Sequence, residues 1–261
     1  AYKTPSFVCV PIVHQGNMLG VVNVGDKLTG ASFSEADMQV LAAISNQIAP
    51  SVENAALYRA LEERCAAVIQ TLVTVLEAKD RYTSGHSQRV GEYATALGRA
   101  AGASEAEVEN LSLASQLHDI GKIAVHDFIL KKPGRLTVEE RKLFNSHPSI
   151  GEHLVQTLDF LDPVRPIIRH HHERMDGGGY PDGLRGDAIP RSVRMLTLAD
   201  SYDAMTSERP YRPAMSPAEA ADEIRRCAGD QFDGELADVF CQEVVLQNGA
   251  RRAGSDALSG R

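Results

Sequence analysis

Two apolar, β-rich runs near the start of the chain predict a β-hairpin. They cover residues 7–13 and 18–24, and the polar turn between them contains Gly16. After a polar loop, the stretch Ser34-Glu35-Ala36-Asp37 has the pattern of a helix N-terminus, where a hydroxyl and a carboxylate three residues later cap each other's backbone amides. A helix is therefore expected to follow the hairpin.

The helical pattern that begins there continues to about Leu76. Its second half repeats apolar residues at alternating steps of four and three, at Leu61, Cys65, Val68, Leu72 and Val75. This repeat is typical of the narrow seam of a coiled coil, and a helix packed on its own domain is the alternative. We therefore expect a homodimer joined through this helix.

The rest of the chain consists of predicted helices with short loops, without an alternating strand pattern. Three further capping boxes begin at Ser104, Thr137 and Ser216. The final residues, 248–261, are small, polar and aperiodic, which predicts a disordered tail. The expected fold class is mainly α, with a small α/β part at the N-terminal end.

Composition excludes several classes of protein. The chain has 261 residues, of which 43% are hydrophobic, enough for one large domain or two smaller ones. No stretch approaches the roughly 18 apolar residues of a membrane span, and the first residues lack the pattern of a signal peptide. Because the chain starts at Ala1, we expect it to be part of a longer protein.

Charge and cysteine usage narrow the class further. The net charge of −8 disfavours binding to a nucleic acid polymer, which requires a basic surface. The four cysteines form no CxxC pair, so a disulfide framework and a thiolate zinc site are both disfavoured. This usage fits the reducing cytoplasm, where we expect the protein to be located.

Histidine and aspartate residues recur where the predicted helices face inward. The apolar stripe of one helix includes His86, and the period of another puts His171 and His172 on one face but leaves His170 off it. Seven residues share such inward positions: His86, His118, Asp119, His147, His171, His172 and Asp200. Imidazoles and carboxylates that converge in this way are typical metal ligands in hydrolases. As ordinary core residues many of them would be left unpaired, at roughly 1–3 kcal/mol each, so we expect a metal site.

Several runs of sequence carry a resemblance to known families. The main runs are residues 77–86, 118–122, 147–151, 171–181, 198–205 and 209–212. Together they resemble the motifs of an HD-GYP domain, a branch of the HD phosphohydrolase superfamily, to which we assign residues 77–247. Residues 1–56, with Val10-Pro11-Ile12 and Phe33-Ser34-Glu35-Ala36-Asp37, are similar to the C-terminal part of a GAF sensory domain. The resemblances imply an HD-type helical bundle and a small α/β GAF remnant, joined by a signalling helix over residues 57–76.

The HD-GYP resemblance implies a metal-dependent phosphodiesterase. Such enzymes hydrolyse the bacterial second messenger cyclic di-GMP to linear pGpG, and some continue to GMP. One ion would be held by His86, His118, Asp119 and Asp200. A second ion would be held by Asp119, His147, His171 and His172. Tyr82 stands where some members carry a Glu that supports a third ion, so we expect two, and the absence of thiolates favours iron or manganese.

The same resemblance implies roles for residues around the ions. Lys122 and Asp119 are the expected catalytic residues. The expected substrate-binding residues are Lys122, Tyr180, Arg209 and Arg212. Arginine suits bidentate contacts with phosphate, and the tyrosine offers a ring for guanine or a hydroxyl for phosphate. Asp176 and Asp203 are expected to support metal ligands, and Glu173 to be either a ligand or a support.

Two other functions stay open. The chain could bind a cyclic dinucleotide or a partner protein without hydrolysis, and the mark of that function would be a lost ligand or a lost Lys122. It could also hydrolyse a different cyclic dinucleotide. The GAF part is expected to regulate the enzyme through the connecting helix, but the sequence does not identify its ligand.

Overall fold

The computed structural model describes residues 6–79, 85–208 and 213–245. By its internal contacts the chain divides into two compact units, residues 1–68 and 69–261. One long helix, α1 (Glu35–Lys79), begins in the first unit and ends in the second. Within the described ranges no helix has both the length and the apolar composition needed to cross a membrane.

The first unit pairs a β-hairpin with the start of α1. Strands β1 (Phe7–His14) and β2 (Asn17–Gly25) are antiparallel, as the sequence predicted. Ser45 on α1 is buried, and its hydroxyl donates to the carbonyl of Pro11 on β1 at 2.8 Å. A polar residue within an apolar helix face is thus satisfied by the strand on which the helix packs.

The second half of α1 has two apolar faces with different surroundings. Ile69, Val73 and Leu76 are buried in the core of the second unit. The predicted seam is another stripe of the same helix, which this single chain leaves largely exposed: Leu61, Val68, Leu72 and Val75 are exposed and Cys65 is half-buried. The stripe is therefore open to a partner helix, and the dimer seam stays a prediction.

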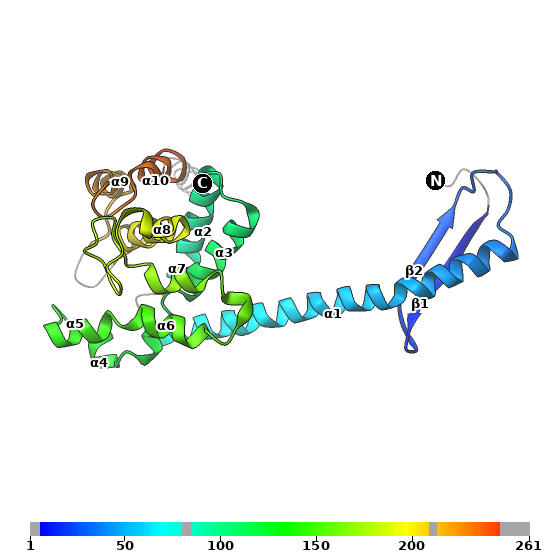
Figure 1. Cartoon of the computed structure of the whole chain (residues 1–261), viewed down its shortest axis with the longest axis horizontal. Helices are drawn as coiled ribbons and strands as arrows, with labels where there is room; N and C mark the ends of the chain where they lie inside the picture. The colour runs from blue at the N-terminus through cyan, green and yellow to red at the C-terminus, as the bar shows by residue number, and fades with distance from the viewer. Residues whose placement is uncertain (1–5, 80–84, 209–212, 246–261) are drawn as a thin grey trace, which may run out of the picture. The chain divides into compact units, whose positions relative to one another are not determined.

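The second unit is built from short helices, and the longest of the described connections between them runs from α7 to α8 (Figure 1). Its α-helices are α2 (His86–Ala100), α3 (Glu105–Leu117), α4 (Asp127–Leu130), α5 (Val138–Phe144), α6 (His147–Val155), α7 (Arg165–His170), α8 (Arg191–Thr206), α9 (Pro217–Arg226) and α10 (Gly234–Val239). Single turns and a π-helix complete the order: the 3-10 helices η1 (Ile120–Ala124), η2 (Asp159–Leu161) and η3 (Gly186–Ala188), and the π-helix η4 (Phe240–Val245). The capping boxes predicted at Ser104, Thr137 and Ser216 are all present.

The core of the second unit lies where α2, α3 and α8 pack against one another (Figure 1). Leu97, Leu111 and Leu196, one from each helix, are fully buried there, and Phe240 of η4 is buried with them. The middle of these helices is apolar because it lies in the core. Polar residues such as His86, at the start of α2, lie at the helix ends. The mainly helical fold class predicted from the sequence is confirmed. The packing of the helices brings together the helix ends that carry histidine.

Candidate metal centre

Three histidines at helix ends are held in the same way. His118 follows α3, His147 starts α6 and His171 follows α7. In each ring, Nδ1 lies 2.7 or 2.8 Å from the carbonyl oxygen three residues earlier in the chain. A carbonyl only accepts hydrogen bonds, so Nδ1 carries the proton and Nε2 keeps a lone pair. The local backbone thus fixes the tautomer that a metal ligand requires.

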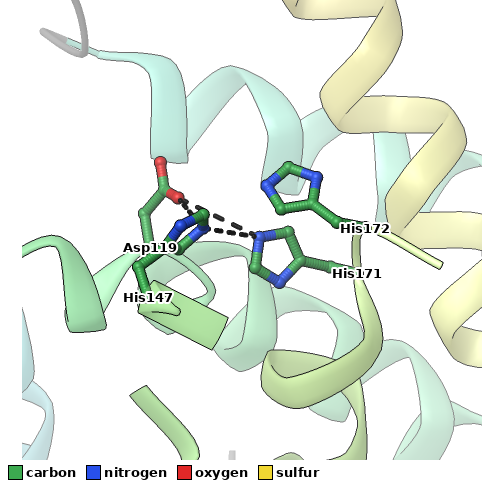
Figure 2. A group of neighbouring side chains, drawn as sticks. All are labelled: Asp119, His147, His171 and His172. Atoms are coloured by element: carbon green, nitrogen blue, oxygen red, sulfur yellow. Dashed lines mark hydrogen bonds and ion pairs between the residues drawn. The ribbon is translucent and has the colours of Figure 1, made fainter. Parts of the chain in front are cut away.

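The Nε2 atoms that carry these lone pairs are either unpartnered or face one another in the described part of the chain. His118 Nε2 is buried and has no hydrogen-bond partner among the described residues. The Nε2 atoms of His147 and His171 are 3.4 Å apart, so two lone pairs face each other (Figure 2). An unpaired buried polar atom costs roughly 1–3 kcal/mol, and a cation between the lone pairs removes that cost. The donor set therefore fits a divalent metal ion.

Burial keeps the rings of His118, His171 and His172 neutral. It lowers the pKa of His118 and, together with the neighbouring His172, lowers the pKa of His171 well below its ordinary range. Burial also lowers the pKa of His172 to about 3. A neutral imidazole is the form that binds a metal, because protonation would occupy the lone pair.

Asp119 lies between two groups of candidate ligand atoms. Its Oδ1 is 3.3 Å from His147 Nε2 and 4.0 Å from His171 Nε2, whereas its Oδ2 is 3.6 Å from His118 Nε2. The atoms of each group lie within 4.8 Å of one another, and the groups are Asp119, His147, His171 and His172, and His86, His118 and Asp119. Burial alone would raise the pKa of Asp119, but the charge of Lys122, 2.6 Å from Oδ2, holds that pKa well below its usual range. One carboxylate thus presents an oxygen to each group.

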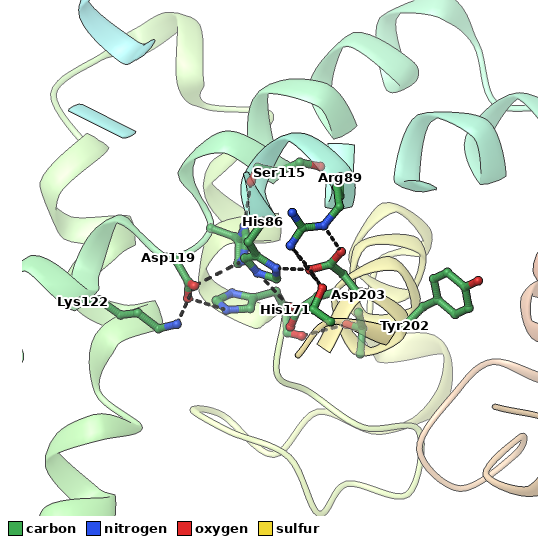
Figure 3. A network of polar contacts seen from close by, with 12 residues as sticks. His86, Arg89, Ser115, Asp119, Lys122, His171, Tyr202 and Asp203 are labelled. Carbon is green, nitrogen blue, oxygen red and sulfur yellow. Dashed lines mark hydrogen bonds and ion pairs between the residues drawn. The ribbon is translucent and has the colours of Figure 1, made fainter. Parts of the chain in front are cut away.

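His86 belongs to the second of these groups and is held by two carboxylates of α8, of which Figure 3 labels Asp203. Its Nε2 is 3.3 Å from Asp200 Oδ1 and its Nδ1 is 2.7 Å from Asp203 Oδ2. Burial alone would lower the pKa of His86, but these hydrogen bonds raise it to about 10, so a metal ion that binds this ring has to displace a proton. Asp203 in turn accepts two hydrogen bonds from Arg89, at 2.6 and 3.0 Å. Sequence reasoning missed Arg89, and its position one helical turn after His86 was the available signal.

A glycine-rich loop brings Tyr180 against His172. The two ring centroids are 4.9 Å apart, and the Tyr180 N–H donates to the His172 carbonyl. A Cβ on Gly179 would lie 2.6 Å from that carbonyl oxygen and 2.5 Å from Glu173 Cα, so only glycine fits there. The Glu173 carboxylate accepts the backbone N–H groups of residues 182–184. Glu173 thus holds this loop, and whether it also acts as a ligand or as a support of one stays a prediction.

Several predicted residues lie elsewhere. The predictions for Tyr82, Arg209, Arg212 and the tail 248–261 fall outside the described residues. Asp176 pairs with Arg174 and accepts the N–H of Gly178, so it supports its own loop instead of a metal ligand. His170 lies 2.9 Å from Asp182 and belongs to neither group of candidate ligand atoms.

A helical domain whose histidines and aspartates form two groups around a shared carboxylate is a candidate metal-binding domain. The HD domain family matches residues 70–236, and the GAF domain family matches residues 1–52. The chain therefore belongs to the HD domain family. The predicted resemblance to an HD domain preceded by part of a GAF domain is confirmed.

Similar proteins include two kinds of phosphodiesterase. The chain is 38% identical over 182 residues to the cyclic di-GMP phosphodiesterase response regulator RpfG of Xanthomonas campestris, covering 69% of this chain and 48% of that protein. It is 32% identical over 212 residues to the 3'3'-cGAMP-specific phosphodiesterase 2 of Vibrio cholerae, covering 80% of this chain and 41% of that protein. A solved cyclic GMP-AMP specific phosphodiesterase of V. cholerae matches with a TM-score of 0.53 at 22% identity, over 67% of this chain and 47% of that one. The chain thus spans about half the length of these relatives or less, and the structural match concerns the fold alone.

Proposed function

We propose that the second unit is a metal-dependent phosphodiesterase that hydrolyses cyclic di-GMP to linear pGpG. The observation that carries this proposal is the Asp119 carboxylate, which faces two groups of ligand atoms and the ammonium of Lys122. Membership of the HD domain family and relatives named as cyclic di-GMP phosphodiesterases support it. A relative that binds without hydrolysis would be expected to have lost Lys122 or a ligand, and neither is lost here.

We assign the ligands to two ions. One set is His86, His118, Asp119 and Asp200, and the other is Asp119, His147, His171 and His172. Nitrogen and oxygen donors without thiolates suit iron or manganese. When bound, the ions supply a water acidic enough to lose a proton near neutral pH and positive charge for the phosphoryl oxygens.

The chain's own side chains bind the substrate and keep the ligands in order. The Lys122 ammonium, next to Asp119, offers a positive charge to the scissile phosphate. Tyr180 offers a ring beside His172 on which a guanine can stack. Asp203, held by Arg89, fixes the ring of His86. We retain Arg209 and Arg212 as proposed phosphate contacts.

We propose Arg141 as a further phosphate contact, which sequence reasoning missed. It is exposed on α5 and forms no ion pair within the described ranges of the chain. Burial raises the pKa of Tyr180, and the positive charge of Arg141 opposes that rise. Phe144, one turn later, lies 5.7 Å below the Lys122 ammonium. Arg141 thus adds an exposed cation on the helix whose Phe144 lies next to the Lys122 ammonium.

We expect Arg141→Ala to raise KM for cyclic di-GMP about 3- to 10-fold and to leave kcat within about twofold, because a partly screened charge contact contributes to binding more than to chemistry. Steady-state kinetics on metal-loaded protein measures both constants. Lys142→Ala is the matched control, since Lys142 is the next residue of the same helix and is also exposed. An equal rise of KM in both variants would mean that the overall positive charge of α5 attracts the substrate and that Arg141 makes no specific contact with phosphate.

A related substrate has specific support. Relatives named 3'3'-cGAMP-specific phosphodiesterases match this chain at 32 and 39% identity, so a mixed cyclic dinucleotide is the second candidate. Both substrates present two phosphates and purine rings, and the described residues of the site do not discriminate between them.

Turnover and metal content measured on the same sample test the proposal. Protein purified without oxygen and reconstituted with Fe²⁺ or Mn²⁺ is expected to hold about two ions per chain and to release pGpG from cyclic di-GMP. Faster hydrolysis of 3'3'-cGAMP would favour the second candidate. Failure of the metal-loaded protein to hydrolyse either compound would reject the enzyme and leave a binding module.

We also propose that two chains associate through the exposed stripe of α1 and that the GAF part regulates turnover in the cytoplasm. The boundaries of this arrangement are residues 1–56, 57–76 and 77–247. The stripe defined by Leu61, Val68, Leu72 and Val75 supports it, because exposed apolar residues at this spacing bury each other in a coiled coil. Sedimentation equilibrium of the chain tests the oligomeric state.

A further inference from the structure

Lys79, the last residue of α1, forms hydrogen bonds with the segment that carries Lys122. The Lys79 ammonium donates to the carbonyl oxygens of Ile123 at 2.6 Å and Val125 at 2.8 Å, and lies 3.4 Å from that of Lys122. Its ion pair with Asp127 is longer, at 3.9 Å. The Lys79 ammonium therefore donates its hydrogen bonds to backbone carbonyls that lie 43 to 46 residues further along the chain.

These carbonyls lie at or just after the C-terminal end of η1, where a helix leaves acceptors without a partner of its own; among them, that of Lys122 also accepts the Val125 N–H. A lysine ammonium has three donors and a positive charge, and both suit the negative end of a helix. The Lys79 side chain is 25% exposed, so its hydrogen bonds are partly shielded from water. The side chain of Lys79, on α1, thus caps the C-terminal end of η1.

The opposite side of η1 is fixed to the metal centre. Asp119 is the residue before η1, and Lys122 within it reaches back to Asp119 at 2.6 Å. A Cβ on Gly121 would lie 1.9 Å from the carbonyl oxygen of His147, so η1 packs directly on the backbone of that candidate ligand. A shift of η1 therefore moves Asp119 and Lys122 relative to His147.

The end of α1 is itself anchored in the same unit. Ile69, Val73 and Leu76 are buried in its core, on the three turns before Lys79. Lys79 consequently links the connecting helix to η1 through direct hydrogen bonds, with no intervening residue. If the last turn of α1 moves, either these hydrogen bonds stretch or break, or η1 moves together with α1.

We propose that Lys79 is a positioning residue: it holds η1 so that Lys122 meets Asp119, and it is the point at which movement of α1 alters the catalytic centre. Its effect on turnover rests on the proposed phosphodiesterase function. Its effect on the structure of η1 does not.

Hydrogen exchange tests the structural part without any substrate. In Lys79→Met the backbone amides of Lys122 and Val125, which donate within η1, are expected to exchange about tenfold faster than in the wild-type chain. Lys79→Arg keeps a multidentate cation and is expected to stay close to wild type. The control is Lys131→Met, which removes an exposed lysine paired with Asp127. Unchanged exchange in Lys79→Met, or the same change in the control, would overturn the inference.

A double-mutant cycle tests whether Lys79 acts through Lys122. Lys79→Met alone is expected to lower kcat about tenfold with metal content unchanged, and to add little in the Lys122→Met background. Full additivity, or a loss of ions in Lys79→Met, would show that Lys79 does not act through Lys122. A wild-type chain without turnover would defeat the proposed function, and the exchange comparison would still decide whether Lys79 holds η1.

Discussion

Asp119→Ala is expected to lose both candidate ion sites and essentially all turnover, by a factor on the order of 10³ or more. The physical reason is the position of its two oxygens, which face His147 and His118 respectively, so one substitution removes a ligand from each group. Metal analysis and turnover of cyclic di-GMP, measured on the same sample, give both results. Addition of Mn²⁺ should raise the unfolding temperature of the wild type but not of the variant, because only a folded site binds the ion.

Asp187→Ala is the control for this experiment, since its carboxylate is fully exposed and pairs only with Arg194 in the described part of the chain. It should keep the ion content and turnover of the wild type. If Asp119→Ala retained about two ions per chain, the shared carboxylate would not bridge the groups, and the ligand assignment would have to be revised.

Lys122→Met is expected to lower kcat by about 10²- to 10³-fold while the ions stay bound. Methionine keeps the length of the side chain but removes the charge that lies 2.6 Å from Asp119 and faces the proposed phosphate position. The comparison with Asp119→Ala separates the two roles, because one variant loses ions and the other does not.

Lys132→Met serves as the matched lysine control, because Lys132 pairs with Glu140 away from the histidines. Turnover in this control should equal that of the wild type. A Lys122→Met variant with full turnover would remove Lys122 from the catalytic residues and reduce it to a partner of the Asp119 carboxylate.

Local features of this protein could be predicted because they depend on neighbours in the sequence. The hairpin turn, the cap at Ser34 and the capping boxes at Ser104 and Thr137 each involve residues within four positions of one another. The inward position of His86 also followed from the helical period, and it is 6% exposed. Periodicity and short-range hydrogen bonds carry this information directly.

The second half of α1 shows that periodicity does not predict which of two apolar faces of a helix is buried. Apolar residues occur on two faces of its second half, and the sequence gives no reason to prefer Val73 over Leu72 as a core residue. In the folded chain Val73 is 3% exposed and Leu72 is 43% exposed. Which face packs on the second unit is decided by the shape of that unit's core.

The sequence by itself determined the helical class, the helix starts and the set of histidines and aspartates that face inward. Only the tertiary structure decided which atoms meet: the two oxygens of Asp119 with different groups, Arg89 with Asp203, and Lys79 with η1. The last two contacts join residues 114 and 44 positions apart. Contacts of this kind depend on how whole helices pack, because a shift of about 1 Å between helices breaks a hydrogen bond without changing the period of either sequence.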